Sequence, residues 1–216
     1  MKLKSMTLLC VYIFSSGITQ QLLPSRPVAT YSIVAMDKTT GQLGVAVQSH
    51  WFSVGFLVPW AKAGVGAVAT QSFVKVDYGP EGLKLMESGM TATEVLRILT
   101  SQDDGEDLRQ VGMIDFNGNV AVHTGKRCIK HAGHVTGDNY SVQANMMANG
   151  TVPKAMANAF ENSKGDLADR MMAALEAAEA EGGDIRGKQS AAMLIVSGDP
   201  TGVDWKDTIL SLRIED

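Results

Sequence analysis

Proline and charged side chains are scarce in this chain, since 6 of its 216 residues are proline and 19% are charged. Together with 22 glycines and 45% hydrophobic residues, this composition excludes a disordered chain, a collagen and a simple coiled coil, and it indicates a globular protein. Basic side chains are also in the minority. Residues 1–29 hold three of the 19 basic side chains and no acidic one, so 16 basic and 23 acidic side chains follow, a net charge of −7. We therefore expect no nucleic-acid partner, because phosphate binding needs an excess of positive charge.

The sequence also lacks a hydrophobic run long enough to cross a bilayer. Lys2 and Lys4 precede the apolar run MTLLCVYIF, residues 6–14, which is shorter than the roughly 20 residues that a membrane helix needs. Small residues at positions 15–17 follow this run. A basic start, a short apolar run and small residues are typical of a secretory signal peptide, with cleavage expected before Ile18.

These features predict a secreted or periplasmic protein without stable membrane insertion. Residues 1–17 are the expected signal peptide, residues 18–29 a leader remnant or linker, and residues 30–216 a single domain of ordinary size. One of the two cysteines, Cys10, lies in the signal peptide, so Cys128 is alone in the mature chain. We therefore expect no intramolecular disulfide.

Hydrophobic patterning predicts an α+β domain. Segments that alternate or are rich in β-branched residues read as three hairpins and two closing strands, at residues 30–37 and 42–49, 56–60 and 65–71, 110–115 and 119–124, 191–197 and 208–213. Helical spacing occurs at residues 78–89, 91–101 and 152–162, and in a helix opened by Asp166 that stops at Gly182. This order predicts two antiparallel sheets face to face, each covered outside by helices, a four-layer αββα sandwich.

Two glycine-rich strings resemble nucleotide-binding motifs without their context. The G-x-G-x-x-A string at residues 64–69 runs into a strand, where a dinucleotide site needs the start of a helix. The G-x-x-x-x-G-K string at residues 182–188 has Gln189 where a hydroxyl residue is required, and it lies between a helix and a strand. We therefore expect no cofactor.

A thiol and two imidazoles lie close together in sequence. Cys128, His131 and His134 have two residues between successive members, a spacing that could serve a metal ion. Cys128 could alternatively be a nucleophile with His134 as its base. The favoured interpretation is a small buried thiol beside loop histidines, with no metal bound, because no second compact ligand pair is present.

Several segments, taken together, resemble a known bacterial family. They are TYSIVAMDKTTGQLGVAVQS, VPWAKAGVGAVATQ, YGPEGL, HTGKRC, AGH, GDNYSVQANM and GDIRGKQSAAML, in this order from Thr30 to about Val196. In these segments the chain is similar to the family catalogued as domain of unknown function 1028, which is assigned to the Ntn (N-terminal nucleophile) hydrolases. The resemblance implies the same αββα sandwich and hydrolysis of an amide bond.

The resemblance also implies roles for particular residues. Thr30, the first residue of the first strand, becomes the nucleophile, and its own α-amine, with a pKa of about 8, becomes the base. Backbone N–H groups near Thr70 and Gln71 form the expected oxyanion hole. Ser49 and His50 leave the neighbouring strand and are expected to orient the amine.

The remaining expected site residues contact the substrate, which is a small-molecule or peptide amide. They are Asn145 and three residues of one loop, Asp184, Arg186 and Lys188. A homo-oligomer is compatible with this interpretation.

The expected amine needs a cleavage that signal peptidase does not supply. Relatives often carry the threonine directly after the initiator methionine, whereas 29 residues precede Thr30 here. Cleavage before Ile18 leaves ITQQLLPSRPVA attached, so a second cleavage after Ala29 is required. The alternative is an exported binding module of the same fold that holds a cell-wall fragment or peptide without catalysis.

Overall fold

A computed structural model describes residues 30–215, which form ten strands and five α-helices. The predicted signal peptide and leader, residues 1–29, lie outside the described residues. In the part of the chain that is described, no helix is both long and apolar enough to span a membrane.

The larger sheet has six antiparallel strands in the order β10-β9-β2-β1-β8-β7. Their bounds are β1 Thr30–Met36, β2 Leu43–Ser49, β7 Gly133–Gly137, β8 Tyr140–Asn145, β9 Ser190–Val196 and β10 Thr208–Glu215. The central strand β1 is buried along almost its whole length. It is flanked by β2 and β8, so the start of the described chain lies inside the sheet rather than at its edge.

The smaller sheet has four antiparallel strands in the order β3-β4-β5-β6. Their bounds are β3 Pro59–Lys62, β4 Gly66–Ser72, β5 Arg109–Asp115 and β6 Val120–Thr124. The five helices are α1 Tyr78–Glu87, α2 Ala92–Ser101, α3 Val152–Asn162, α4 Leu167–Ala180 and the short α5 Asp204–Asp207.

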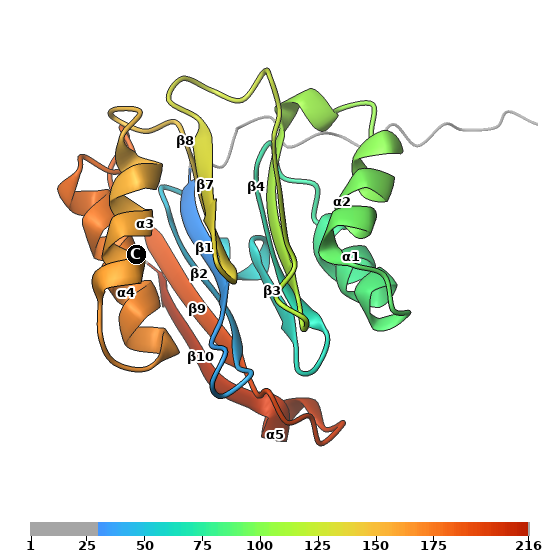
Figure 1. Ribbon diagram of the computed structural model, residues 1–216. Helices are drawn as coiled ribbons and strands as arrows, with labels where there is room; N and C mark the ends of the chain where they lie inside the picture. The colour runs from blue at the N-terminus through green and yellow to red at the C-terminus, as the bar shows by residue number, and fades with distance from the viewer. Residues whose placement is uncertain (1–29, 216) are drawn as a thin grey trace, which may run out of the picture.

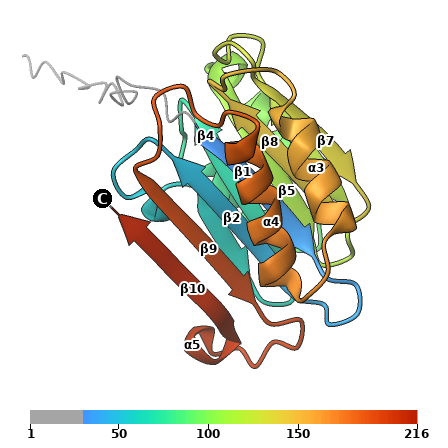
Figure 2. The same ribbon diagram turned by 90° about the vertical axis from the view of Figure 1, so that its left-hand side faces the viewer.

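The elements form layers, as Figure 1 shows. Helices α3 and α4 lie outside the six-stranded sheet, the two sheets face each other, and α1 and α2 lie outside the four-stranded sheet. The predicted α+β arrangement of two antiparallel sheets is therefore confirmed. Figure 2 shows that α4 lies over β1 and β2, while β9 and β10 are left without a helix above them.

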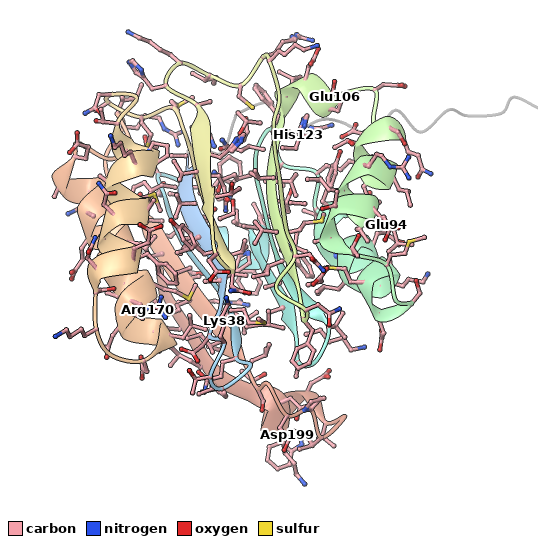
Figure 3. The ribbon with its side chains drawn as sticks, viewed as in Figure 1. Lys38, Glu94, Glu106, His123, Arg170 and Asp199 are labelled. Atoms are coloured by element: carbon pink, nitrogen blue, oxygen red, sulfur yellow. The ribbon has the colours of Figure 1, made fainter. Side chains whose placement is uncertain are left out.

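Three apolar clusters hold the layers together, and burial of apolar area is the main force that does so. One lies between the six-stranded sheet and α3/α4, and includes Ile33, Phe160 and Met171. A second lies between the sheets, where β2 and β9 face β3 and β4. The third joins the four-stranded sheet to α1 and α2. Figure 3 shows side chains filling the space between these layers.

Helix starts follow the local chemistry that the sequence predicts. Thr91 caps α2 and forms a capping box with Glu94, each side chain bonding to the other residue's backbone N–H. Asp166 caps α4 by accepting from Asp169 N. Helix α4 stops before Gly182 and Gly183, both of which have positive φ.

Three features differ from the expected elements, and one is the short helix α5, which was not predicted. The strand expected at residues 56–60 is displaced to Pro59–Lys62, because Val54–Phe56 forms a 3₁₀ turn in which Leu57 N and Val58 N both donate to Val54 O. The hairpin of β7 and β8 was not predicted at all. It completes the six-stranded sheet on the far side of β1.

Candidate active site

Thr30 opens the central strand β1 and lies between two other polar residues. Its register partners are Ser49 on β2 and Asn145 on β8. Residues paired across an antiparallel sheet project from the same face, and the Thr30 hydroxyl donates to Ser49 Oγ at 3.1 Å. All three side chains are fully buried. The structure thus brings together three residues that the sequence assigned to one site.

The face of β1 that carries Thr30 looks toward the other sheet, where Gln71 meets it. Gln71, on β4, accepts from Ser32 Oγ at 2.7 Å and donates from Nε2 to Gln110 Oε1 at 2.7 Å. The same Nε2 lies 3.3 Å from the carbonyl oxygens of Thr30 and Gln143. Gln71 is therefore a buried link between the two sheets at the start of β1.

Gln143 on β8 extends this network. It donates to Ser32 Oγ at 2.7 Å and accepts from Ser141 Oγ at 2.8 Å. Its amide lies against Gly112 of β5, where an added Cβ would come within 2.5 Å of Gln143 Oε1. A glycine at this position leaves the space that the buried amide needs.

Gln110 on β5 connects the network to Asn145. Gln110 Oε1 accepts from Asn145 Nδ2 at 3.0 Å, and Gln110 Nε2 donates to Thr124 Oγ1 and to the carbonyls of Gly133 and Ala144. Asn145 Oδ1 is buried and has no hydrogen-bond partner among the described residues. An unsatisfied buried acceptor is uncommon, and this one belongs to the residue paired with Thr30.

Several glutamines and serines that surround Thr30 were not predicted from the sequence. Ser32, Gln110, Ser141 and Gln143 all project into the space between the sheets. Their signal was alternation: polar residues occupy every second position of residues 141–145. Polar residues at alternate positions normally mark a solvent-facing side, whereas here that side is buried against the second sheet.

Thr70 does not join Thr30. Its side chain projects from the opposite face of β4 to that of Gln71, and its hydroxyl donates to Lys75 O. Its backbone N–H donates to Val58 O at 3.2 Å. The expected oxyanion donor at Thr70 is therefore already engaged in the structure, while Gln71 contributes its side-chain amide to the site.

The expected loop residues gather next to His50, one residue beyond Ser49. The Asp184 carboxylate accepts from His50 N at 3.1 Å and pairs with Arg186 at 3.1 Å. His50 Nδ1 is buried without a hydrogen-bond partner in the described part of the chain. Lys188 pairs with another residue, since its Nζ lies 3.5 Å from Glu179 Oε1.

Glu179 also joins the strand that carries Thr30. The Tyr31 hydroxyl donates to Glu179 Oε2 at 2.9 Å on the helix-facing side of the sheet. Burial raises the pKa of Tyr31 far above its usual value, and the hydrogen bond to Glu179 raises it further. Tyr31 is therefore a permanent donor that anchors the start of β1 to α4.

A comparison with family models identifies the chain. The model of a family of unknown function, DUF1028, matches residues 30–216. The chain belongs to the DUF1028 family. Among solved structures, this DUF1028 chain is similar to protein SPO2555 from Silicibacter pomeroyi, described as DUF1028, with 32% identity and a TM-score of 0.77 over 87% of this chain and 78% of that one. The comparison with curated proteins gives no match.

In this DUF1028 member the thiol and imidazoles at residues 128–134 do not converge. Cys128 Sγ donates to Arg109 O, and His134 Nδ1 lies 2.9 Å from Thr124 Oγ1. Burial raises the pKa of the Cys128 thiol and lowers that of His134. No group of three metal-ligating side chains occurs among residues 30–215. His123 Nε2 instead lies 2.9 Å from Glu106 Oε2. Both residues are labelled in Figure 3.

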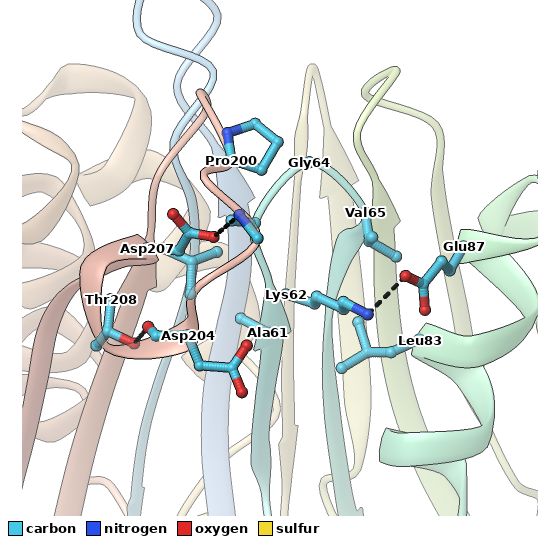
Figure 4. Close-up of a pocket in the computed structure, with 13 residues that line it drawn as sticks. Ala61, Lys62, Gly64, Val65, Leu83, Glu87, Pro200, Asp204, Asp207 and Thr208 are labelled. Atoms are coloured by element: carbon cyan, nitrogen blue, oxygen red, sulfur yellow. Dashed lines mark hydrogen bonds and ion pairs between the residues drawn. The ribbon is translucent and has the colours of Figure 1, made fainter.

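A cavity of about 650 Å³ lies at the opposite end of the sheets from Thr30. The cavity is bounded by the end of β3, the end of β9 and the start of β10. Thr30 pairs with the end of β2, and the end of β2 pairs with the start of β9. The cavity and Thr30 therefore lie at opposite ends of β9. Figure 4 shows Lys62 paired with Glu87 on one side of this cavity and Asp204 on the other.

Proposed function

We propose that this DUF1028 protein is an exported amide hydrolase in which Thr30, freed by cleavage after Ala29, is both nucleophile and base. The observation that carries the proposal is the position of Thr30: a hydroxyl residue at the first position of the central strand, set in a buried polar network with Ser49 and Asn145. The Ntn-type fold and the export both belong to the proposal.

The proposed reaction needs no group outside Thr30 to move the proton. The free α-amine accepts the hydroxyl proton while Oγ1 attacks the amide carbonyl carbon. The resulting ammonium then protonates the leaving nitrogen, which departs as an amine and leaves an ester on Thr30. A water molecule, deprotonated by the same amine, attacks this ester, releases a carboxylic acid and restores the hydroxyl.

Two neighbours support the amine in this role. Ser49 Oγ lies 3.1 Å from the nucleophilic oxygen and keeps the Thr30 side chain oriented. Asn145 Oδ1 is buried, unpaired within the described residues and on the register partner of Thr30. The amide of the uncleaved chain has a single N–H at Thr30. A free amine formed there would have additional N–H donors for this acceptor.

The burial of Thr30 in the uncleaved chain is consistent with activity only after cleavage before Thr30. In the uncleaved chain the residue is fully buried, and its nitrogen is an amide without basicity. We therefore expect the full-length chain to be inactive and the chain beginning at Thr30 to be active.

The test compares three forms of the protein on a panel of N-acyl amides and dipeptides, with amine release as the readout. The forms begin at Ile18, begin at Thr30, or begin at Thr30 with Thr30→Ser as a conservative variant. We expect turnover only from the two forms with a free residue 30, rising with pH through the amine pKa of about 8. Equal turnover from the form that begins at Ile18 would refute the proposal.

A second candidate function is a binding module without catalysis, and the cavity at the other end of the sheets favours it. That cavity holds about 650 Å³, a size typical of small-molecule sites. Lys62 and Asp204 offer charges of both signs at its rim. Thermal-shift screening of cell-wall fragments and peptides, with Asp204→Ala as the control, tests it: stabilisation without amide turnover supports this candidate.

A further inference from the structure

The described sheets have four edge strands, and β10 differs from the other three. β3, β6 and β7 contain four or five residues each, and β7 carries a glycine at both ends. β10 contains eight residues, TILSLRIE. Short edges resist pairing with other chains, whereas a long strand presents a row of unpaired N–H and C=O groups.

The exposed side chains of β10 are unusually apolar for an edge. Leu212 is 52% exposed and Ile214 is 71% exposed. With Leu210, they project from the face whose partners on β9 are Ile195, Met193 and Ala191. Met193 and Ile195 are buried in the cluster under α4, and Leu210 packs against that cluster. Helix α4 does not extend over β10, as Figure 2 shows, so Leu212 and Ile214 meet solvent. A long apolar edge of this kind indicates a pairing surface.

From this edge we infer that two copies of the chain associate through β10, antiparallel about a two-fold axis at Leu212. This register places Leu212 opposite Leu212 of the second copy and Ile214 opposite its Leu210. The apolar row is symmetric about Leu212, so it matches itself when it is reversed, as a two-fold interface requires. Two six-stranded sheets then join into one continuous sheet.

The side chains that face each other favour this register over its two neighbours. With the axis at Leu212, Arg213 faces Ser211 of the second copy and remains over the ring of Phe56, 3.9 Å from its centroid. An axis at Arg213 would place two guanidinium groups directly opposite each other, which is unfavourable. An axis at Ser211 would place Ile214 opposite a threonine, Thr208. The axis at Leu212 avoids both arrangements.

Crosslinking tests this register directly. In a full-length chain with Cys10→Ser and Cys128→Ser, Leu212→Cys places two thiols opposite each other, within the Cα separation of about 4.4–6.8 Å that a disulfide needs. We expect mild oxidation to give a covalent dimer. Ile214→Cys is the matched control, because its two copies lie four residues apart along the strands, about 13 Å, and do not react. Equal crosslinking of the two variants would overturn the register.

Introducing a charge at Leu212 tests the association itself. The mass of each variant is measured by sedimentation at micromolar concentration. We expect the unaltered chain at twice the mass of one copy, and both Leu212→Lys and Leu212→Glu as monomers. A mixture of the two variants should recover the dimer, which also shows that both variants are folded. A monomeric unaltered chain, or a mixture that stays monomeric while both variants melt cooperatively, would overturn the proposal.

Discussion

Gln71 should be essential for stability, and the structure gives the size of the effect. Replacing this fully buried residue by leucine removes the acceptor of Ser32 and the donor to Gln110, two bonds of 2.7 Å. Leaving a buried polar group unsatisfied costs about 1–3 kcal/mol. Ser32 Oγ still accepts from Gln143 and Gln110 Oε1 still accepts from Asn145, so we expect Gln71→Leu to cost about 2–4 kcal/mol in total.

Gln48 provides a matched control on the neighbouring sheet. Its side chain is also buried, but neither Nε2 nor Oε1 has a hydrogen-bond partner among the described residues. Gln48→Leu therefore removes two unsatisfied groups and adds apolar contact. We expect it to be neutral or to stabilise the protein by up to about 2 kcal/mol.

Thermal unfolding followed by circular dichroism measures both variants. For a domain of this size, about 1 kcal/mol corresponds to roughly 2–4 °C, so Gln71→Leu should lower the Tm by about 4–16 °C. Gln48→Leu should leave the Tm unchanged or raise it. If both variants lost the same stability, the hydrogen bonds of Gln71 would not explain its burial, and the reasoning would be refuted.

Three further predictions concern other parts of the molecule. Burial raises the pKa of Asp103, but hydrogen bonds from Arg109 and Gly105 outweigh this and hold it below its usual value. The ionised Asp103 therefore stabilises the folded protein above about pH 4, and this stabilisation is lost as the pH falls through the lower pKa of the folded state. Urea titrations should show that Asp103→Asn lowers the free energy of unfolding by about 3 kcal/mol at neutral pH and by little in acid. Cys128, whose pKa burial raises, should react with iodoacetamide far more slowly in the folded than in the unfolded protein; equal rates would contradict this. Thr91→Ala removes the capping box of α2 and should lower the free energy of unfolding by about 1 kcal/mol in urea titrations, whereas an unchanged midpoint would contradict the capping role.

Local chemistry made much of the fold predictable. A helix cap depends on residues three positions apart, so Thr91 and Asp166 could be recognised without any tertiary information. The tight turn between β1 and β2 likewise fixes their register. That register places Thr30 opposite Ser49, which is why the sequence could bring these two residues to one site.

The β7–β8 hairpin was not predictable by the same means. β7 consists of GHVTG, in which glycine at both ends hides the alternation that identifies a strand. β8 pairs with β1 over more than 100 positions of sequence, so nothing local places Asn145 beside Thr30. The polar residues at alternate positions of β8 are buried only because the second sheet covers their face, and the local sequence does not show this.

The space between the two sheets has two unlike halves. Hydrocarbon side chains fill the half under β2 and β9, whereas amides and hydroxyls fill the half under β1 and β8. Hydrocarbon contacts tolerate small sideways displacement, but amide bonds have fixed directions and lengths. The amide half therefore fixes how one sheet is aligned on the other. It prevents the two sheets from sliding past each other at the end where Thr30 lies.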